Sequence, residues 1–138
     1  MRAELQNKLI GKYPDLFKDR FLGMQSNLMC FGCECSDGWY KLLDTLFNAI
    51  TNHYKNNVEQ ECPTLIQVKE KYGELRVYLS HEDEYTSGML SMAEDISLTI
   101  CEECGAPGQP NYYDDNGEYI PEFAGWVRTR CKEHKGDY

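Results

Sequence analysis

The spacing of apolar residues predicts two short helical segments at the start of the chain. Apolar positions recur at helical spacing within residues 3–10, and residues 15–21 form a second short helical pattern. Gly11 and Pro14 separate the two segments. Residues 22–36 show no period and contain two glycines and three cysteines, so we expect irregular structure there.

A long amphipathic helix is predicted next. It should begin after Ser36 or Asp37, because either side chain can accept a hydrogen bond from the free amides of a first helical turn. It should end near Asn56 and Asn57. His53 lies beside the apolar stripe, where we expect it to be packed or half-exposed rather than to bind a metal. The stripe has i, i+3, i+4, i+7 spacing and consists of Trp39, Leu42, Leu43, Leu46, Phe47, Ile50 and Tyr54.

Between Thr64 and Ser80 the apolar period shortens to that of a strand. Two antiparallel strands are predicted, with Gly73 in the left-handed position of the hairpin turn. The acidic run 82–84 then suits the positive end of a helix dipole. The apolar face of that helix is predicted to consist of Met89, Met92, Ala93 and Ile96.

These elements predict an α+β fold, with helices packed on a small antiparallel hairpin or sheet. We expect residues 1–97 to form this core and residues 98–138 to form a zinc-ribbon-like module packed on it. About forty residues cannot build an apolar core of their own, and a bound metal is the usual substitute.

The 138-residue chain has a net charge of −9, and this charge is unevenly distributed. Residues 1–80 carry ten acidic side chains and ten Lys or Arg, whereas residues 81–138 carry thirteen acidic side chains and four Lys or Arg. Such an acidic half repels a phosphate backbone, so direct binding to nucleic acid is disfavoured. It suits a basic partner surface or mimicry of nucleic acid, although solubility alone also explains it.

The sequence contains no sign of a membrane or secretory segment. No apolar run is long enough to span a bilayer, and the first eight residues lack the apolar stretch of a secretory signal. We therefore expect a cytoplasmic protein, in which the seven cysteines stay reduced or bind metal rather than form disulfides.

The last part of the chain contains a strong metal-binding pattern. It consists of C-x2-C at Cys101 and Cys104, then 26 residues, then C-x2-H at Cys131 and His134. Thiolates and imidazole are ligands that zinc prefers, and four of them complete a tetrahedral shell. One structural Zn²⁺ is therefore predicted, and a closed shell of this kind leaves no open position for catalysis.

The residues around the four ligands fit this prediction. Gly105 permits the tight turn that a C-x2-C pair needs, and the turn sequence at 114–117 predicts a hairpin between the two ligand pairs. Three thiolates around one Zn²⁺ leave a negative charge that nearby cations can offset. These cations are Arg128, Arg130, Lys132 and Lys135.

The remaining cysteines give a weaker signal. A second metal site would need Cys35, Cys62 or His53 to complete the C-x2-C pair at Cys30 and Cys33. No second compact pair follows, and buried free thiols are common, so free thiols are the simpler interpretation. The pair also lacks the strand-to-helix context of a thioredoxin-type redox site.

Three sequence blocks resemble one known family. They are ECSDGWYKLLDTL (34–46), QVKEKYGELRVYL (67–79) and SLTICEECGAPG with GWVRTRCKEH (97–134). Taken in this order, they resemble a family of small proteins encoded by tailed bacteriophages and prophages. Members of that family carry a cysteine at the position of His134, a difference that keeps a zinc-competent ligand. The resemblance implies a phage accessory protein made in the bacterial cytoplasm, and it implies no particular activity.

No catalytic signature is found in the sequence. A zinc deaminase would have a proline before the first cysteine and an H-x-E motif upstream. Here Ile100 precedes Cys101, and Asp83 stands where the catalytic glutamate should follow His81. A non-enzymatic protein is therefore the favoured expectation.

A second candidate surface is polar. On opposite strands, Lys69, Lys71 and Arg76 can converge on one face and bind a phosphate or an acidic partner. Glu34 and Asp37 lie at the start of the long helix. A solvated strand face and a helix cap are the simpler explanation of these residues.

The expected function is that of a non-enzymatic protein that binds a bacterial host protein, for example to inhibit host defence as anti-CRISPR proteins do. The partner would present a basic surface, and the contact would include Glu102, Glu103, Asp114 and Asp115. Two alternatives stay open. One is a nucleotide- or phosphate-binding protein that uses the three hairpin cations, and the other is a DNA mimic.

Overall fold

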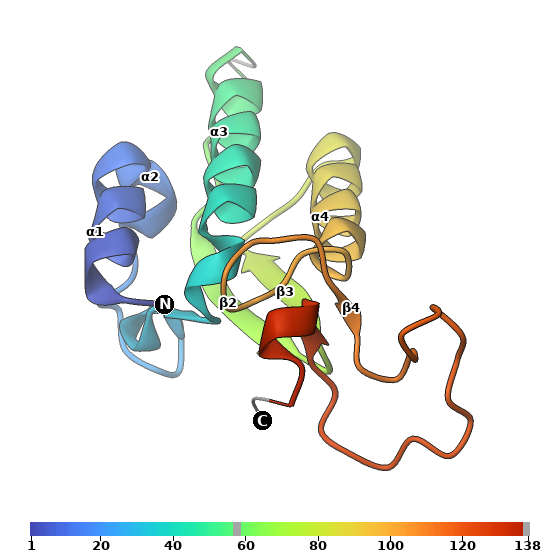
Figure 1. Cartoon of the computed structure of the whole chain (residues 1–138). Coiled ribbons are helices and arrows are strands. Elements are labelled where there is room, and N and C mark those ends of the chain that lie inside the picture. Colours follow the sequence, from blue (N-terminus) through green and yellow to red (C-terminus); the bar gives the residue numbers. More distant parts are fainter. Residues whose placement is uncertain (57–58, 137–138) are drawn as a thin grey trace.

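The computed structural model describes residues 1–56 and 59–136 and confirms the predicted α+β class. Its α-helices are α1 (Ala3–Lys12), α2 (Pro14–Phe17), α3 (Tyr40–Asn56) and α4 (Glu84–Ser97). In Figure 1, α1 and α2 lie on one side of α3 and α4 lies on the other. Asn57, expected near the end of α3, lies outside the described residues. Within the described part of the chain, no helix is both long and apolar enough to cross a bilayer.

The strands form two separate sheets. β1 (Cys33–Glu34), β2 (Leu65–Lys71) and β3 (Glu74–Leu79) form a three-stranded sheet in that order, and β4 (Gln109–Pro110) pairs with β5 (Thr129–Arg130). β3 runs antiparallel to β2, whereas β1 runs parallel to it. The larger sheet is therefore mixed: the predicted antiparallel hairpin is present as β2 and β3, and β1 adds a parallel strand beside it. The extra strand lies in the segment expected to be irregular, because two residues are too few to show a period.

Tyr72 and Gly73 form the turn between β2 and β3, with φ angles of 55° and 80°. Two successive left-handed residues are typical of a type I′ hairpin turn, so the expected role of Gly73 is confirmed. A Cβ atom at position 73 would also lie 2.9 Å from Cγ1 of Val127. Glycine therefore lets the C-terminal segment approach the hairpin.

The apolar stripe of α3 is the centre of the core, as predicted. Phe47 and Ile50 are fully buried there, and so is Trp39 just before the helix. The ring of Phe47 meets the rings of Tyr13 and Phe17 edge-on, at centroid distances of 5.8 and 5.7 Å. Such aromatic contacts stabilise the packing of α1 and α2 against α3 by more than the buried apolar area alone would.

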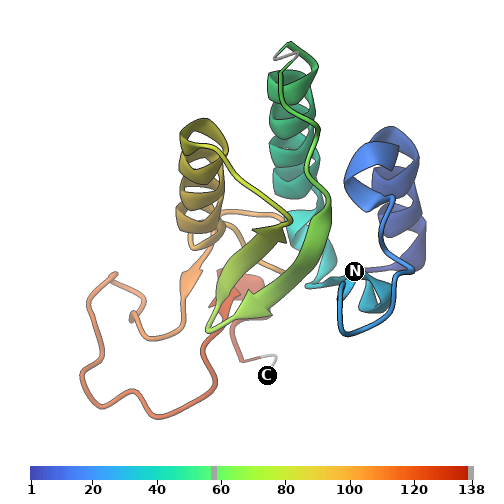
Figure 2. The ribbon, with the colours of Figure 1, turned by 180° about the vertical axis from the view of Figure 1, so that it is seen from behind.

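One face of the three-stranded sheet is buried and the other is open. Cys33, Val68 and Val77 are register neighbours on the three strands, and all three are buried. Glu34 and Lys69 are the next register pair of β1 and β2. Their side chains point to the opposite face, because side chains alternate along a strand. No helix crosses in front of the β2–β3 hairpin in Figure 2.

α4 covers the outer edge of β3 through two side chains. The Glu94 carboxylate accepts a hydrogen bond from the Val77 amide (3.3 Å), and the Ser97 hydroxyl accepts one from the Leu75 amide (2.9 Å). These contacts satisfy donors that an edge strand would otherwise offer to another chain.

The structure corrects one local prediction and refines another. Asp37 does not cap the long helix with its side chain, because it lies in a 3-10 turn (Asp37–Trp39) and its carboxylate binds the amide (2.7 Å) and the guanidinium of Arg2. Ser36 precedes this turn without a capping hydrogen bond. Met92, on the predicted apolar face of α4, is 64% exposed, and Leu90 and Ala93 are the apolar residues of this helix that are buried in the core.

Candidate metal centre

Cys101, Cys104, Cys131 and His134 come together as the sequence predicted. Their ligand atoms all lie within 4.8 Å of one another. The sulfurs of Cys104 and Cys131 are 3.7 Å apart, and Nδ1 of His134 lies 3.3 Å from Sγ of Cys131. Sulfur ligands of a tetrahedral ion with metal–sulfur bonds of about 2.3 Å are about 3.8 Å apart. The cluster therefore has the dimensions of a four-ligand metal site.

The first ligand pair lies in a turn shortly after α4. The amide of Cys101 donates to the carbonyl of Ala106 (2.8 Å), and the amide of Gly105 donates to the carbonyl of Cys101 (2.9 Å). Gly105 has a φ angle of 78°, which confirms that this position needs the left-handed conformation that glycine adopts readily. The main chain thus reverses direction around the two sulfurs.

The second ligand pair follows β5 in a 3-10 turn (Lys132–His134). The amide of His134 donates to the carbonyl of Cys131 (3.2 Å). Pairing of β4 with β5 brings this turn next to the first pair. A Cβ atom at Gly108 would lie 2.8 Å from the amide nitrogen of Cys101 and 3.0 Å from the carbonyl of Arg130. Glycine at position 108 therefore allows the two ligand-bearing segments to approach each other.

The surroundings of Cys131 favour its thiolate form. Desolvation opposes ionisation, but hydrogen bonds from the side chain and main chain of His134 and from the main chain of Glu133 lower the pKa of Cys131 to about 6. Contacts with the sulfurs of Cys131 and Cys101 raise the pKa of His134. A thiolate at neutral pH is the form that binds a metal ion.

The start of α3 holds the first ligand pair. The amide of Gly38 donates to the carbonyl of Glu102 (2.6 Å), and the Trp39 ring donates to the carbonyl of Ile100 (3.0 Å). The amide of Ser36 donates to the Glu102 carboxylate (3.1 Å). The SDGW part of the first sequence block thus anchors the ligand turn to the core.

The β2–β3 turn holds the strand that leads to the second ligand pair. The hydroxyl of Thr129 donates to the carbonyl of Gly73 (2.7 Å), and Nη1 of Arg128 lies 2.5 Å from Oε2 of Glu70. The three sequence blocks quoted above are therefore in contact around the metal centre, although they are far apart along the chain.

A buried ion pair lies beside the metal ligands. Arg130 and Glu102 are only 7% and 5% exposed, and Nη1 of Arg130 lies 3.0 Å from Oε2 of Glu102. Nη2 of Arg130 lies 2.9 Å from Oε1 of Glu103. Buried charges are tolerated only with such partners. The expectation that Glu102 belongs to an acidic contact surface is wrong, because its side chain is turned inward to Arg130.

The other acidic candidates of this segment also have partners. The carboxylate of Asp114 accepts hydrogen bonds from the amides of Asn116 and Glu118, both 2.8 Å long, and so stabilises the predicted turn at 114–117. Asp115 is exposed and forms an ion pair with Lys135. Glu103 is exposed although it contacts Arg130.

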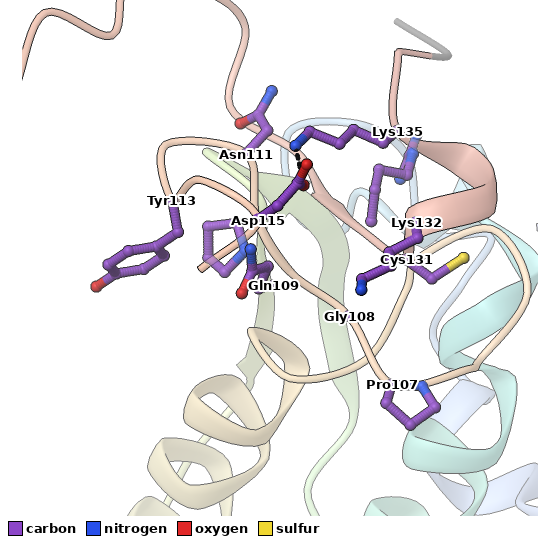
Figure 3. Close-up of a pocket in the computed structure, with 11 residues that line it drawn as sticks. Pro107, Gly108, Gln109, Asn111, Tyr113, Asp115, Cys131, Lys132 and Lys135 are labelled. Carbon is purple, nitrogen blue, oxygen red and sulfur yellow. Dashed lines mark hydrogen bonds and ion pairs between the residues drawn. The ribbon is translucent and has the colours of Figure 1, made fainter. Parts of the chain in front are cut away.

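Three of the four cations expected to offset the thiolate charge pair with carboxylates instead. Arg128 pairs with Glu70, Arg130 with two glutamates, and Lys135 with Asp115. Lys132 forms no ion pair within the part of the chain that is described. A pocket of about 230 Å³ beside Cys131 is lined by Lys132 and bordered by the Asp115–Lys135 pair (Figure 3).

The hairpin cations share one face, as predicted. Lys69 and Arg76 are register neighbours on β2 and β3, and Lys71 lies two residues further along the same face. Arg76 is neutralised by Glu74 (2.8 Å) and Glu94 (3.3 Å). Its guanidinium is therefore less available to a phosphate than the two lysines are.

The two acidic residues grouped with this surface have separate partners. Glu34 is exposed on the open face of the sheet and accepts a hydrogen bond of 3.5 Å from the Gln67 amide group. Asp37 is bound to Arg2, as described above. Glu34 is therefore the one of the two that faces solvent beside the lysines.

The remaining cysteines are separate thiols. Cys33 and Cys35 are buried, Cys62 is partly buried and Cys30 is exposed. Burial raises the pKa of Cys33 to about 12 and also raises the pKa of Cys35. Within residues 1–56 and 59–136, these thiols form no second cluster of three or more metal ligands.

No protein family, curated protein or solved structure matches the chain. The resemblance to phage-encoded proteins therefore stays a prediction from the three sequence blocks. The contacts around the metal centre give those blocks a shared structural role.

Proposed function

We propose that this chain is a zinc-stabilised, non-enzymatic binding protein of a tailed phage, acting in the bacterial cytoplasm on a host protein with a basic surface. A set of three cysteines and one histidine favours zinc among the common metal ions, since thiolate and imidazole in a tetrahedral shell suit it. The observation that carries the proposal is that the chain supplies four ligands and fixes both pairs to the core. A metal ion held in this way stabilises a fold and has no open position for a substrate.

The charge of the exposed surface supports a basic partner. Glu84 and Asp95 of α4, together with Glu118 and Glu122 after β4, are exposed. Their carboxylates form no ion pair or hydrogen bond within the described residues. Free carboxylates of this kind steer and orient a basic partner.

Capture of partners from a bacterial lysate tests this function. We expect one of two double variants, Glu84→Lys with Asp95→Lys or Glu118→Lys with Glu122→Lys, to lose the captured protein. Glu4→Lys, in the charge-balanced part of the chain, is the control and should retain it. Unchanged capture by both double variants would refute the proposal. A captured protein that handles nucleic acid, and that salt releases, would favour the DNA-mimic alternative.

A second candidate function is the binding of a nucleotide or another phosphate ligand on the open face of the sheet. Lys69 and Lys71 form no ion pair within the described residues, and Tyr72 and Trp126 are 73% and 70% exposed. These four residues line a pocket of about 320 Å³, which is large enough for a small ligand. Lysine binds phosphate as a point charge, and exposed aromatic rings stack on bases.

Calorimetric titration with ATP tests the second candidate. Lys71→Ala should abolish binding, because it removes an exposed cation of the pocket. Lys41→Ala removes an exposed lysine from α3, outside this pocket, and should leave the affinity unchanged. Equal ATP affinities of the Lys71→Ala variant and the unmodified protein would refute this function.

A further inference from the structure

An apolar groove lies between α3 and α4. It has a volume of about 510 Å³, and its main apolar residues are Leu42, Leu46, Tyr85, Met89, Met92 and Ile96. Figure 1 shows the two helices standing beside each other. Tyr85 and Met92 are each 64% exposed. Contiguous apolar surface of this kind on a folded chain marks a contact site for another molecule.

The apolar residues of α4 contribute to the core and to the groove to different degrees, and Ala93 belongs to both. Leu90 and Ala93 are each 5% exposed and pack against the core. Met89 and Met92 lie on the neighbouring face of the helix and line the groove. Unbranched methionine side chains adapt to partners of irregular shape, and they are common at such binding surfaces.

The charge on the α4 side of the groove is negative. Glu84 is the charged residue of its lining, and Asp95 lies three helical turns further along the same side of α4. Neither carboxylate has a partner within the described residues, and α4 contains no Lys or Arg. A bound segment with basic residues on its flank would form ion pairs with both carboxylates.

The length and the helical walls of the groove indicate which kind of segment can bind in it. Its lining extends from Glu84 to Ile96 along α4, which corresponds to about 18 Å of helix. An apolar groove between two helices is the surface on which an amphipathic helix lays its apolar face.

We propose that the α3–α4 groove binds a basic amphipathic helix of about three turns from a partner protein. This inference rests on the proposed function, since it names the surface and the segment through which a basic partner binds. The partner helix covers Tyr85 and Met92 and places lysine or arginine side chains beside Glu84 and Asp95.

A synthetic helical peptide tests the proposal on the full chain. The peptide has about 14 residues, with leucine at i, i+3, i+4 and i+7 and lysine on the opposite face. In NMR spectra of the methionine methyl groups, we expect the signals of Met89 and Met92 to shift on titration. The signal of Met24, which is also 64% exposed but lies outside the groove, should not shift.

Two matched variants and one matched peptide make the test specific. Met92→Lys should weaken the peptide's affinity about tenfold or more, whereas Met24→Lys should leave it unchanged. A scrambled peptide of the same composition has no apolar face, so it measures the general attraction between a basic peptide and an acidic protein. We expect it to bind at least about tenfold more weakly than the amphipathic peptide.

Three results would overturn the groove as a docking site. They are equal affinity for the scrambled peptide, affinity that Met92→Lys does not change, and the lack of any methionine shift at millimolar peptide. The failure of the groove and the failure of the proposed function are distinguishable. Lysate capture that depends on Glu118 and Glu122 but not on Met92 would keep the function and remove the groove.

Discussion

The amide of Gly38 donates a hydrogen bond of 2.6 Å to the carbonyl of Glu102, and this contact joins the start of α3 to the turn that holds the first two metal ligands. A side chain at position 38 would collide with the carbonyl oxygens of Cys101 and Glu102. Glycine is therefore required here by the close approach of another main-chain segment.

Substitution of Gly38 by alanine should lower the free energy of unfolding by about 3 kcal/mol, because a collision with main-chain atoms cannot be relieved by a rotamer change. Chemical denaturation at a fixed zinc concentration measures this loss. Gly11→Ala is the control, since its added Cβ would have no atom within 4 Å. It should raise stability by about 0.5–1 kcal/mol, as alanine favours a helix. An unchanged stability of Gly38→Ala would contradict the packing described here.

Replacement of Glu102 by glutamine should lower the free energy of unfolding by about 3 kcal/mol, because it removes the buried carboxylate partner of Arg130 and leaves this guanidinium with the more exposed Glu103. Glu103→Gln removes a partly exposed partner of the same arginine and should cost less than about 1 kcal/mol. Both losses can be measured by urea unfolding. Equal losses for the two variants would show that the burial of Glu102 has no energetic importance.

The stability of α4 should depend on pH through Asp83. Its contact with His53 (2.6 Å) and its hydrogen bond from the Thr86 amide (2.8 Å) hold the pKa of Asp83 well below its usual range. Because the pKa is lower in the folded state, this stabilisation is complete above the unfolded pKa of about 3.9 and is lost as pH falls through the folded pKa.

The variant Asp83→Asn keeps an acceptor for the helix cap but loses the charge. At pH 7 it should melt at a lower temperature than the unmodified protein. This difference should shrink steadily below about pH 4, where Asp83 begins to protonate in the unfolded chain. A difference in melting temperature that is the same at pH 7 and at pH 3 would contradict the role of the carboxylate.

Alkylation rates should separate five of the seven cysteines into three groups. Cys30 is exposed and should react with iodoacetamide first. Cys33 and Cys35 should stay unmodified in the folded protein, because burial blocks them and raises their pKa values. Removal of the metal by a chelator should make Cys104 and Cys131 reactive, with Cys131 the faster since its pKa is about 6. Peptide mapping measures the rates, and rapid labelling of Cys33 would contradict its burial.

The helices, the hairpin and the metal ligands could be predicted because their signals are local. The apolar stripe of α3 repeats within a few helical turns, and each ligand pair spans four residues. Gly73 itself adopts the left-handed conformation that the hairpin turn requires. Local patterns of this kind record the conformation of a segment without reference to the rest of the chain.

Contacts between distant segments could not be predicted. β1 has only two residues and exists through its pairing with β2. Asp37 has the sequence context of a helix cap, but its carboxylate forms an ion pair with Arg2 instead. Glu102 stands next to another glutamate and so looked like a surface residue, whereas Arg130 binds it in the interior. In each case a partner far along the chain decides where the side chain lies.

Zinc bound per chain, measured by elemental analysis of protein purified without added metal, tests the metal centre most directly. The unmodified protein and Cys30→Ser should each hold one zinc ion per chain, because Cys30 lies outside the ligand cluster. Cys101→Ser should hold little or none, and His134→Cys should keep the ion, since cysteine is also a zinc ligand. Full zinc content in Cys101→Ser would contradict the assigned site.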